Sequence, residues 1–167
     1  MRFRPATEAD LPRLKAMYAR LVDHMNQNGV AIWNEFYPCE VLADDIAAHE
    51  LYVLADGDSI AAAFALCPAN DGAAHVTWRD GCARARYLDR LGVNVEYLRQ
   101  GVGAAMLRHA MDAARQLGAD YLRLFVVDVN RPAIALYRNM GFEQAEGVFD
   151  EHIEDFVLRE YGFEMKL

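Results

Sequence analysis

Two groups of residues have types and spacings that could serve chemistry, and the first is a glycine turn. Gln100, Gly101, Val102, Gly103 and Ala104 lie between a predicted strand and a predicted helix. Glycines let the backbone approach a ligand closely, and the first N–H groups of a helix, with its dipole, favour an anion. The turn therefore suits a pyrophosphate, although the same glycines could simply make a tight turn.

Two common phosphate motifs do not match this turn. A dinucleotide fingerprint, Gly-x-Gly-x-x-Gly, requires a third glycine where Met106 stands. A Walker loop requires Gly-Lys-Ser/Thr, and no lysine is nearby. A nucleotide-binding module is therefore a weaker interpretation of the chain.

The second group is the segment from Asn130 to Phe142, which reads N-R-P-A-I-A-L-Y-R-N-M-G-F. Asn130 can cap a helix, Pro132 suits its first turn, and Gly141 can end it. Tyr137 shares one face with apolar residues at three- and four-residue spacing. The segment predicts a short helix between strands, with a tyrosine on its ordered face.

Together, the two groups resemble the GNAT superfamily of N-acetyltransferases over about residues 88–142. The family's helix motif is matched by Asn-x-x-Ala-x-x-Leu-Tyr-x-x-x-Gly-Phe, which is far more specific than the glycine turn. The family's turn reads Gln/Arg-x-x-Gly-x-Gly/Ala. Gly101 and Gly103 match it, whereas Leu98 stands where Gln or Arg is usual.

The resemblance implies an enzyme that transfers acetyl from acetyl-CoA to a primary amine directly. It implies a mixed, mostly antiparallel central sheet of six to seven strands, splayed at the central strands and flanked by about four helices. An acyl-CoA-binding regulatory domain that has lost turnover is the alternative. The acceptor is expected to be a small molecule, an amino acid or a peptide, and its identity stays open, as does an acyl group longer than acetyl.

Carried over residue by residue, the resemblance assigns contacts with the cofactor, acetyl-CoA (CoA). The backbone around Val93, Asn94 and Val95 would pair with the pantetheine arm, and that of Arg99 to Ala104 would carry the pyrophosphate. Asn130 would hydrogen-bond the arm, and Tyr137 would face the thioester sulfur. The predicted cofactor-binding set is Val93, Asn94, Val95, Arg99, Gln100, Gly101, Val102, Gly103, Ala104, Asn130 and Tyr137.

The reaction requires a neutral amine, an oxyanion donor and a proton for the departing thiolate. Tyr137 can supply that proton, because its high pKa keeps it protonated until it is needed. A backbone N–H such as that of Val95 is the usual type of oxyanion donor. Glu96, expected to end the central strand, is one candidate base, although a solvated carboxylate is the favoured interpretation of this residue. Glu35, a histidine (His24 or His75) and relayed water are the other candidates.

An aromatic segment follows the first predicted helix. Trp33, Glu35 and Tyr37 are predicted to contact the acceptor, because in this fold the segment would overhang the substrate cleft. The alternative is that these rings pack the first two helices onto the sheet. No metal site is expected.

The elements that position these residues follow from periodicity and breakers. The predicted order is strand, two helices, hairpin, strand, helix, strand, helix and two strands. The expected ranges are 2–4, a helix capped by Thr7 with an apolar stripe from Leu11 to Met25, 39–49, 51–55, 60–66, 85–95, 101–117, 121–127, a helix opened by Asn130, 142–149 and 158–166. Residues 68–84 form the least regular stretch.

The 167 residues suggest a single domain, 1–167, and 54% of them are hydrophobic, enough for a core. A formal net charge of −8 argues against nucleic acid as a partner. The chain lacks an apolar run of membrane-spanning length and an apolar signal at its start. Three cysteines without metal spacing favour a cytoplasmic location. A homodimer is left open.

Overall fold

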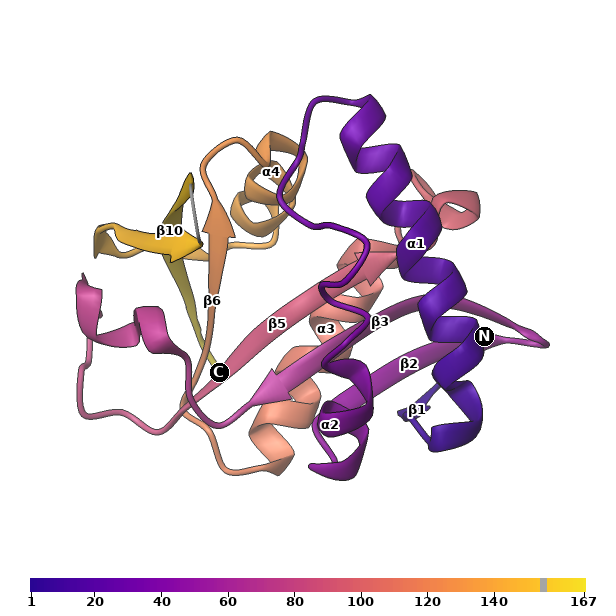
Figure 1. Ribbon diagram of the computed structural model, residues 1–167. Coiled ribbons are helices and arrows are strands. Elements are labelled where there is room, and N and C mark those ends of the chain that lie inside the picture. The colour runs from indigo at the N-terminus through magenta and orange to yellow at the C-terminus, as the bar shows by residue number, and fades with distance from the viewer. Residues whose placement is uncertain (154–155) are drawn as a thin grey trace. The chain divides into compact units, whose positions relative to one another are not determined.

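The computed structural model describes residues 1–153 and 156–167, and Figure 1 shows its ribbon. The chain forms two compact units. The first comprises residues 1–66 and 90–109, and the second comprises residues 67–89 and 110–167. Strand β5 (Ala85–Val93) and helix α3 (Val102–Gln116) contribute residues to both. The expectation of a single domain stays a prediction.

The first unit is built on three consecutive antiparallel strands. These are β1 (Arg2–Pro5), β2 (Leu51–Asp56) and β3 (Ser59–Cys67), and a turn at Gly57 with φ 57° joins the last two. Helices α1 (Leu11–Gln27) and α2 (Leu42–Ala47) lie over the same face of β2 and β3 in Figure 1. A 3-10 turn, η1 (Glu8–Asp10), precedes α1, and Thr7 and Asp10 form the capping box that begins it.

Two layers of side chains form the core of this unit. One layer lies under α1, where Leu14, Met17 and Tyr18 are almost fully buried. On the other, the ring of Phe3 stacks on Tyr52 and also on His109 of α3, with centroids 5.5 and 4.2 Å away. Strand β3 is almost wholly buried, as expected of a strand with helices on both faces.

The second unit centres on β6 (Tyr121–Val127) and β10 (Phe156–Lys166), which pair antiparallel along seven residues. β5 pairs parallel with β6 through residues 85–88. The unit also contains η2 (Asp71–His75), α4 (Arg131–Asn139) and four short strands. These strands are β4 (Val76–Thr77), β7 (Glu143–Gln144), β8 (Glu146–Gly147) and β9 (Phe149–Ile153).

The predicted fold class is confirmed: the protein is mixed α/β with a mostly antiparallel sheet. Hydrogen-bonded neighbours run in the order β1-β2-β3-β5-β6-β10-β7, and β9 also pairs with β10, giving eight strands within the described residues. The part of the chain that the structure describes has four α-helices, matching the predicted number. The splay of the central strands stays a prediction. Among the described residues, no helix is both long and apolar enough to cross a membrane.

Three predicted ranges were wrong in ways that bear on the site, whereas β1, β2, β3, α3 and β10 differ from the expected ranges by only one or two residues at an end. The second helix covers 42–47 rather than 39–49, because residues 37–41 form turns. β5 ends at Val93 instead of Val95, since Asn94 caps a 3-10 turn. The strand expected at 142–149 is three short strands, β7, β8 and the start of β9. Gly147, with φ 98°, turns the chain there, and β8 pairs with β4 whereas β7 and β9 pair with β10.

Candidate active site

The glycine turn of the first unit has the geometry of an anion site. Gly101 adopts φ 79°, and nothing lies within 4 Å of where its side chain would begin. The first helical bond of α3 runs from the Ala105 N–H to the Gly101 carbonyl, at 3.0 Å. The N–H groups of residues 102–104 precede that bond, so the helix does not use them. These free donors and the open backbone fit a pyrophosphate.

Residues just before the glycines help to hold the turn in its conformation. Arg99 also has a left-handed backbone, with φ 61°. The Gln100 side chain donates to the Glu96 carbonyl at 2.8 Å. Side-chain contacts of Arg99 and Gln100 with a cofactor stay predictions, and the structure shows that Gln100 helps to hold the turn.

Asn94 ties the end of β5 to β3. Its backbone N–H donates to the Ala61 carbonyl at 2.9 Å, and its amide donates to the Ile60 carbonyl at 2.9 Å. Its side-chain oxygen accepts from the Glu96 N–H, and its carbonyl accepts from the Tyr97 N–H. Asn94 is almost completely buried. Its groups are therefore engaged within the chain, and Val93 and Val95 flank it.

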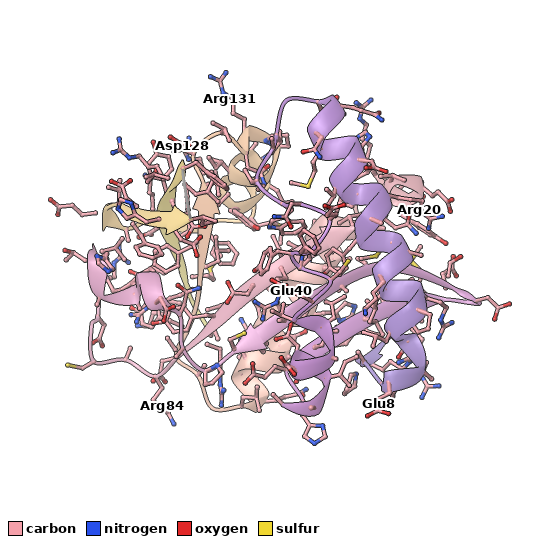
Figure 2. The ribbon with its side chains drawn as sticks, in the orientation of Figure 1. Glu8, Arg20, Glu40, Arg84, Asp128 and Arg131 are labelled. Carbon is pink, nitrogen blue, oxygen red and sulfur yellow. The ribbon has the colours of Figure 1, made fainter. Side chains whose placement is uncertain are left out.

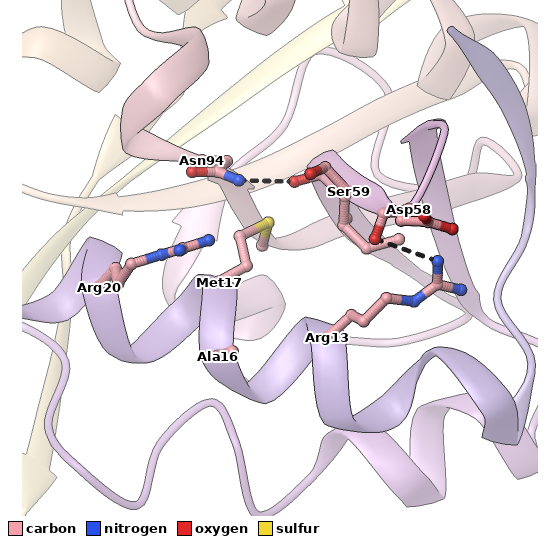
Figure 3. A pocket seen from close by; sticks show the side chains of 8 residues that line it. Arg13, Ala16, Met17, Arg20, Asp58, Ser59 and Asn94 are labelled. Atoms are coloured by element: carbon pink, nitrogen blue, oxygen red, sulfur yellow. Dashed lines mark hydrogen bonds between the residues drawn. The ribbon is translucent and has the colours of Figure 1, made fainter.

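A small cavity lies beside Asn94 and is lined by α1 and the β2–β3 hairpin (Figure 3). Its volume is about 110 Å³. In Figure 3, Arg13 reaches from α1 to the carbonyl of Asp58, which it meets at 3.3 Å. The cavity is too small for a substrate with an acyl chain, and the Asn94 amide in its wall donates to the Ile60 carbonyl. It belongs to the packing that fixes the end of β5.

The prediction that Glu96 ends the central strand was wrong. It belongs to the 3-10 turn η3 (Val95–Tyr97) and is exposed to solvent. Its carboxylate lies 3.8 Å from the guanidinium of Arg20 on α1, which is labelled in Figure 2. Its assignment as a base stays a prediction.

The aromatic segment after α1 packs on that helix. The Trp33 ring lies edge-on to Tyr18 and to Tyr37, with centroids 5.9 and 6.3 Å apart. The Asn34 side-chain oxygen accepts from the N–H groups of Phe36 and Tyr37, at 2.9 and 2.8 Å, and so shapes the loop. Glu35 is exposed. Packing thus accounts for the two rings, and an acceptor contact of Trp33, Glu35 or Tyr37 stays a prediction.

A largely buried ion pair joins α2 to β5 beside this segment. Arg90 donates two hydrogen bonds of 2.8 Å to Asp45 of α2, and its guanidinium lies 3.5 Å from the Tyr37 hydroxyl. Arg90 has φ 55°, an unusual conformation inside a strand, and its carbonyl accepts from the Tyr18 hydroxyl at 2.6 Å. The left-handed residue of β5 thus lies three residues before Val93, where the resemblance assigns the contact with the pantetheine arm.

In the second unit, α4 holds Tyr137 as the sequence predicts. The Asn130 side chain accepts from the Ala133 N–H at 3.3 Å, which confirms the cap. At the other end, the Gly141 N–H bonds to the Arg138 carbonyl and the Phe142 N–H to the Tyr137 carbonyl, both at 3.0 Å. This pair of bonds, with Gly141 at φ 89°, is a Schellman motif. The tyrosine therefore lies in the final turn of a helix fixed at both ends.

The surroundings of Tyr137 keep its hydroxyl protonated. The side chain is 7% exposed, and its ring contacts Phe142 and Phe163, with centroids 5.9 and 6.3 Å away. Burial raises the pKa of Tyr137, and the negative charge of Asp89 raises it further. The hydroxyl therefore remains a proton donor across the neutral range.

Sequence reasoning missed a group of carboxylates in the second unit. Asp89 on β5 accepts from the Asn70 amide at 3.2 and 3.4 Å. Glu151 on β9 and Glu160 on β10 are half-buried. Burial, followed by the charges of Glu151 and Asp89, raises the pKa of Glu160 to about 7. The alternation of β10 indicates that Glu160 and the exposed Arg159 lie on opposite faces of the strand. The residues that surround Glu160 come from other elements, so a local pattern does not reveal them.

A family model confirms the class that the fold and these two motifs define. The model described as Acetyltransferase (GNAT) family matches residues 18–142. Because the match covers more than half of the chain, the protein belongs to the GNAT family of acetyltransferases.

Curated relatives match shorter stretches. Streptothricin acetyltransferase of Streptomyces lavendulae is 54% identical over 43 residues, covering 26% of this chain and 23% of that protein. Thialysine N-epsilon-acetyltransferase of Bos taurus is 33% identical over 87 residues, covering 50% and 49%. The [ribosomal protein bS18]-alanine N-acetyltransferase of Escherichia coli K12 is 41% identical over 58 residues, covering 35% and 39%. The chain thus spans less than half the length of these relatives.

Solved structures agree on the fold over nearly the whole chain. A GNAT-family acetyltransferase from Streptococcus agalactiae superposes with a TM-score of 0.83 at 13% identity, covering 99% of this chain and 95% of that one. The PaiA N-acetyltransferase of Thermoplasma acidophilum, solved with coenzyme A, gives 0.69 at 17% identity, with coverage of 99% and 98%. At these identities the likeness concerns the fold.

Proposed function

We propose that the protein is an acetyl-CoA-dependent N-acetyltransferase that moves an acetyl group directly to a primary amine. The observation that carries this proposal is the family match, which includes both the glycine turn and the capped α4 helix with Tyr137. The relatives named above acetylate amines of different kinds, a ribosomal-protein alanine and a lysine analogue among them. The acceptor is therefore proposed only as a small-molecule, amino-acid or peptide amine.

Each unit supplies a separate part of the proposed chemistry. In the first, the backbone N–H groups from Arg99 to Ala104 would bind the pyrophosphate, and the backbone of Val93 and Val95 would meet the pantetheine arm. Asn94 would keep that backbone in place through its hydrogen bonds to β3. When bound, acetyl-CoA supplies an activated acetyl group as a thioester.

In the second unit, two residues of α4 are assigned. Asn130 uses its side-chain oxygen for the helix cap, and its amide N–H groups are separate donors for the cofactor arm. The Tyr137 hydroxyl would give a proton to the departing thiolate. Glu96 stays a proposed base, and Trp33, Glu35 and Tyr37 stay proposed acceptor contacts. All three cysteines are free thiols, which supports a cytoplasmic location as part of the proposal.

The first test is ligand binding followed by turnover. A thermal-shift series with acetyl-CoA, CoA, ATP and NAD should show selective stabilisation by the CoA species, because ligands that bind the native state raise the melting temperature. A panel of amines, monitored for free thiol, should then show turnover with at least one acceptor. Binding of CoA species without turnover on any amine would favour the regulatory alternative. Replacing acetyl-CoA by longer acyl-CoA donors in the same panel shows which acyl group the protein transfers.

The role of Tyr137 is tested by Tyr137→Phe. Turnover should fall roughly a hundredfold under conditions where chemistry limits the rate, since general acids contribute factors of that order. The dissociation constant for acetyl-CoA should stay within about twofold, because the ring still packs on Phe142 and Phe163. Unchanged turnover would contradict this role.

A further inference from the structure

Tyr18 of α1 binds the backbone of β5 within the first unit. Its hydroxyl donates to the Arg90 carbonyl at 2.6 Å, although the two residues are far apart in the sequence. The Tyr18 side chain is fully buried, and burial raises the pKa of its hydroxyl, so the group stays protonated and can donate. Helix α1 therefore holds one carbonyl of the strand through a short hydrogen bond.

The ring of Tyr18 also lies directly on the strand, at Gly92. A side chain at Gly92 would begin only 2.6 Å from the Tyr18 ring and 3.1 Å from Leu21. Glycine is the residue type that allows a ring to approach the backbone so closely. Tyr18 thus contacts β5 at two points, at Arg90 through its hydroxyl and at Gly92 through its ring.

The backbone of Arg90 has a conformation that needs support from its surroundings. Its φ is 55°, and a left-handed backbone is unfavourable for a residue with a side chain, so it persists only where neighbouring groups fix it. Tyr18 fixes the carbonyl, and Asp45 of α2 accepts two hydrogen bonds of 2.8 Å from the guanidinium. The irregular point of β5 is therefore held by contacts from α1 and α2.

A second anchor follows at the end of the strand. The Asn94 backbone N–H donates to the Ala61 carbonyl of β3, and its side-chain amide donates to the Ile60 carbonyl. Residues 91–93 therefore lie between two fixed points. Because peptide groups are planar, so short a segment has few free torsions, and its orientation depends on how Arg90 is held.

The same segment follows the part of β5 that pairs with β6. Within the described residues, the register of β5 with β6 covers residues 85–88 of β5, whereas β5 continues to Val93. Backbone groups along such a strand can pair with an extended ligand, and hydrogen bonds require good alignment. The pantetheine arm carries amide groups that can pair in this way. The orientation of residues 91–93 would therefore determine how well the arm binds.

We propose, resting on the function proposed above, that Tyr18 is a positioning residue for the pantetheine arm of acetyl-CoA. By holding the Arg90 carbonyl, its hydroxyl sets the orientation of the backbone that leads to Val93. Tyr18 acts through this backbone and does not touch the cofactor. The nucleotide half of the cofactor, assigned to the glycine turn, does not depend on this contact.

A role of Tyr18 in packing alone makes a different prediction. Loss of a packing contact lowers the melting temperature and leaves the relative affinities of the folded protein for two ligands unchanged. A positioning role changes the ratio of the affinities for ligands with and without the arm. That ratio is therefore the quantity to measure.

The test is Tyr18→Phe, which removes the hydroxyl and keeps the ring over Gly92. Calorimetric titration below the melting temperature gives dissociation constants for CoA and for its nucleotide half, which retains the pyrophosphate and lacks the arm. The constant for CoA should rise about tenfold, the order expected for one hydrogen bond, and that for the nucleotide half should stay within about twofold. In the ligand-free variant, amide hydrogen exchange at residues 90–93 should be faster than in the wild type.

Two further variants make the result decisive. Tyr52→Phe removes a hydroxyl from a ring of the first unit that stacks on Phe3, and should bind both ligands as the wild type does. Asp45→Asn weakens the other support of Arg90 and should repeat the selective loss of CoA affinity, so it decides the question if Tyr18→Phe does not fold.

The outcomes separate this proposal from the function on which it rests. Tyr18→Phe that binds CoA as tightly as the wild type, or that loses affinity for both ligands by the same factor, would overturn the positioning role. A wild-type protein that binds CoA no more tightly than the nucleotide half would also overturn it, because the arm would then contribute nothing. A wild-type protein that binds neither ligand would instead overturn the proposed function, and the role of Tyr18 with it.

Discussion

Replacing Glu160 by glutamine should stabilise the protein at alkaline pH, a result that is independent of catalysis. The half-buried carboxyl has its pKa raised from 4.5 to about 7, first by burial and then by the charges of Glu151 and Asp89. A raised pKa means that the folded state binds the proton more tightly than the unfolded chain does. The resulting stability is complete below about pH 4.5 and is lost as the pH rises through about 7.

The magnitude follows from the two pKa values. At 1.36 kcal/mol per pKa unit, ionising Glu160 in the folded state costs about 3 kcal/mol by pH 8. Solvent reaches part of the side chain, so screening leaves roughly half of this, about 1.5 kcal/mol. For a chain of 167 residues that corresponds to about 3–6 °C in melting temperature.

The assay is a set of thermal or urea unfolding curves from pH 5 to pH 8. Glu160→Gln cannot ionise, so its stability relative to the wild type should increase across this range. Glu146→Gln, on the exposed strand β8, should follow the wild type throughout. If the curves for Glu160→Gln and the wild type run parallel between pH 5 and pH 8, the carboxyl does not titrate near 7 and the reasoning on its surroundings is wrong.

Three other substitutions test packing within each unit. Asp45→Ala leaves the buried guanidinium of Arg90 without this carboxylate and should lower the free energy of unfolding, measured in urea, by about 3–5 kcal/mol. The control Asp112→Ala removes an exposed ion pair and should change the free energy of unfolding little. Asp10 is buried, and its hydrogen bonds from Arg4 lead the interactions that hold its pKa far below the usual range. Its contribution to the free energy of unfolding is therefore present above about pH 4 and is lost as the pH falls. The free energy of unfolding of Asp10→Asn should consequently decrease less than that of the wild type as the pH is lowered. Gly72→Ala forces a methyl group onto the Phe125 and Phe149 rings and should cost about 1–3 kcal/mol by chemical denaturation, whereas Gly81→Ala, at an open position, should be nearly neutral.

The elements that the sequence predicts best are those defined by local signals. The expected range of β6 is identical to the observed one, and α3 differs by one residue at each end. Asn130 and Gly141 mark the ends of α4 because capping depends on residues within the helix itself. The position of Tyr137 in the final turn of α4 follows from the same local spacing.

The predictions that failed depend on partners far away in the chain. A strand at residues 142–149 satisfies local propensity, but β7, β8 and β9 pair with two different strands, and Gly147 allows the change of direction. Glu96 follows a strand in sequence, yet Asn94 already ends β5 through its bonds to β3. Neither effect can be read from a local pattern.

Two ionisable side chains of the second unit, Tyr137 and Glu160, differ in how the chain reveals their surroundings. Burial raises the pKa of both Tyr137 and Glu160, and Asp89 adds to both. For a phenol, which ordinarily titrates near 10, this rise only secures the protonated form. For a carboxyl group it moves the pKa to about 7, within the neutral range. Burial therefore has different consequences for the two groups, and the surroundings of Glu160 become visible only once β5, β9, β10 and η2 are brought together.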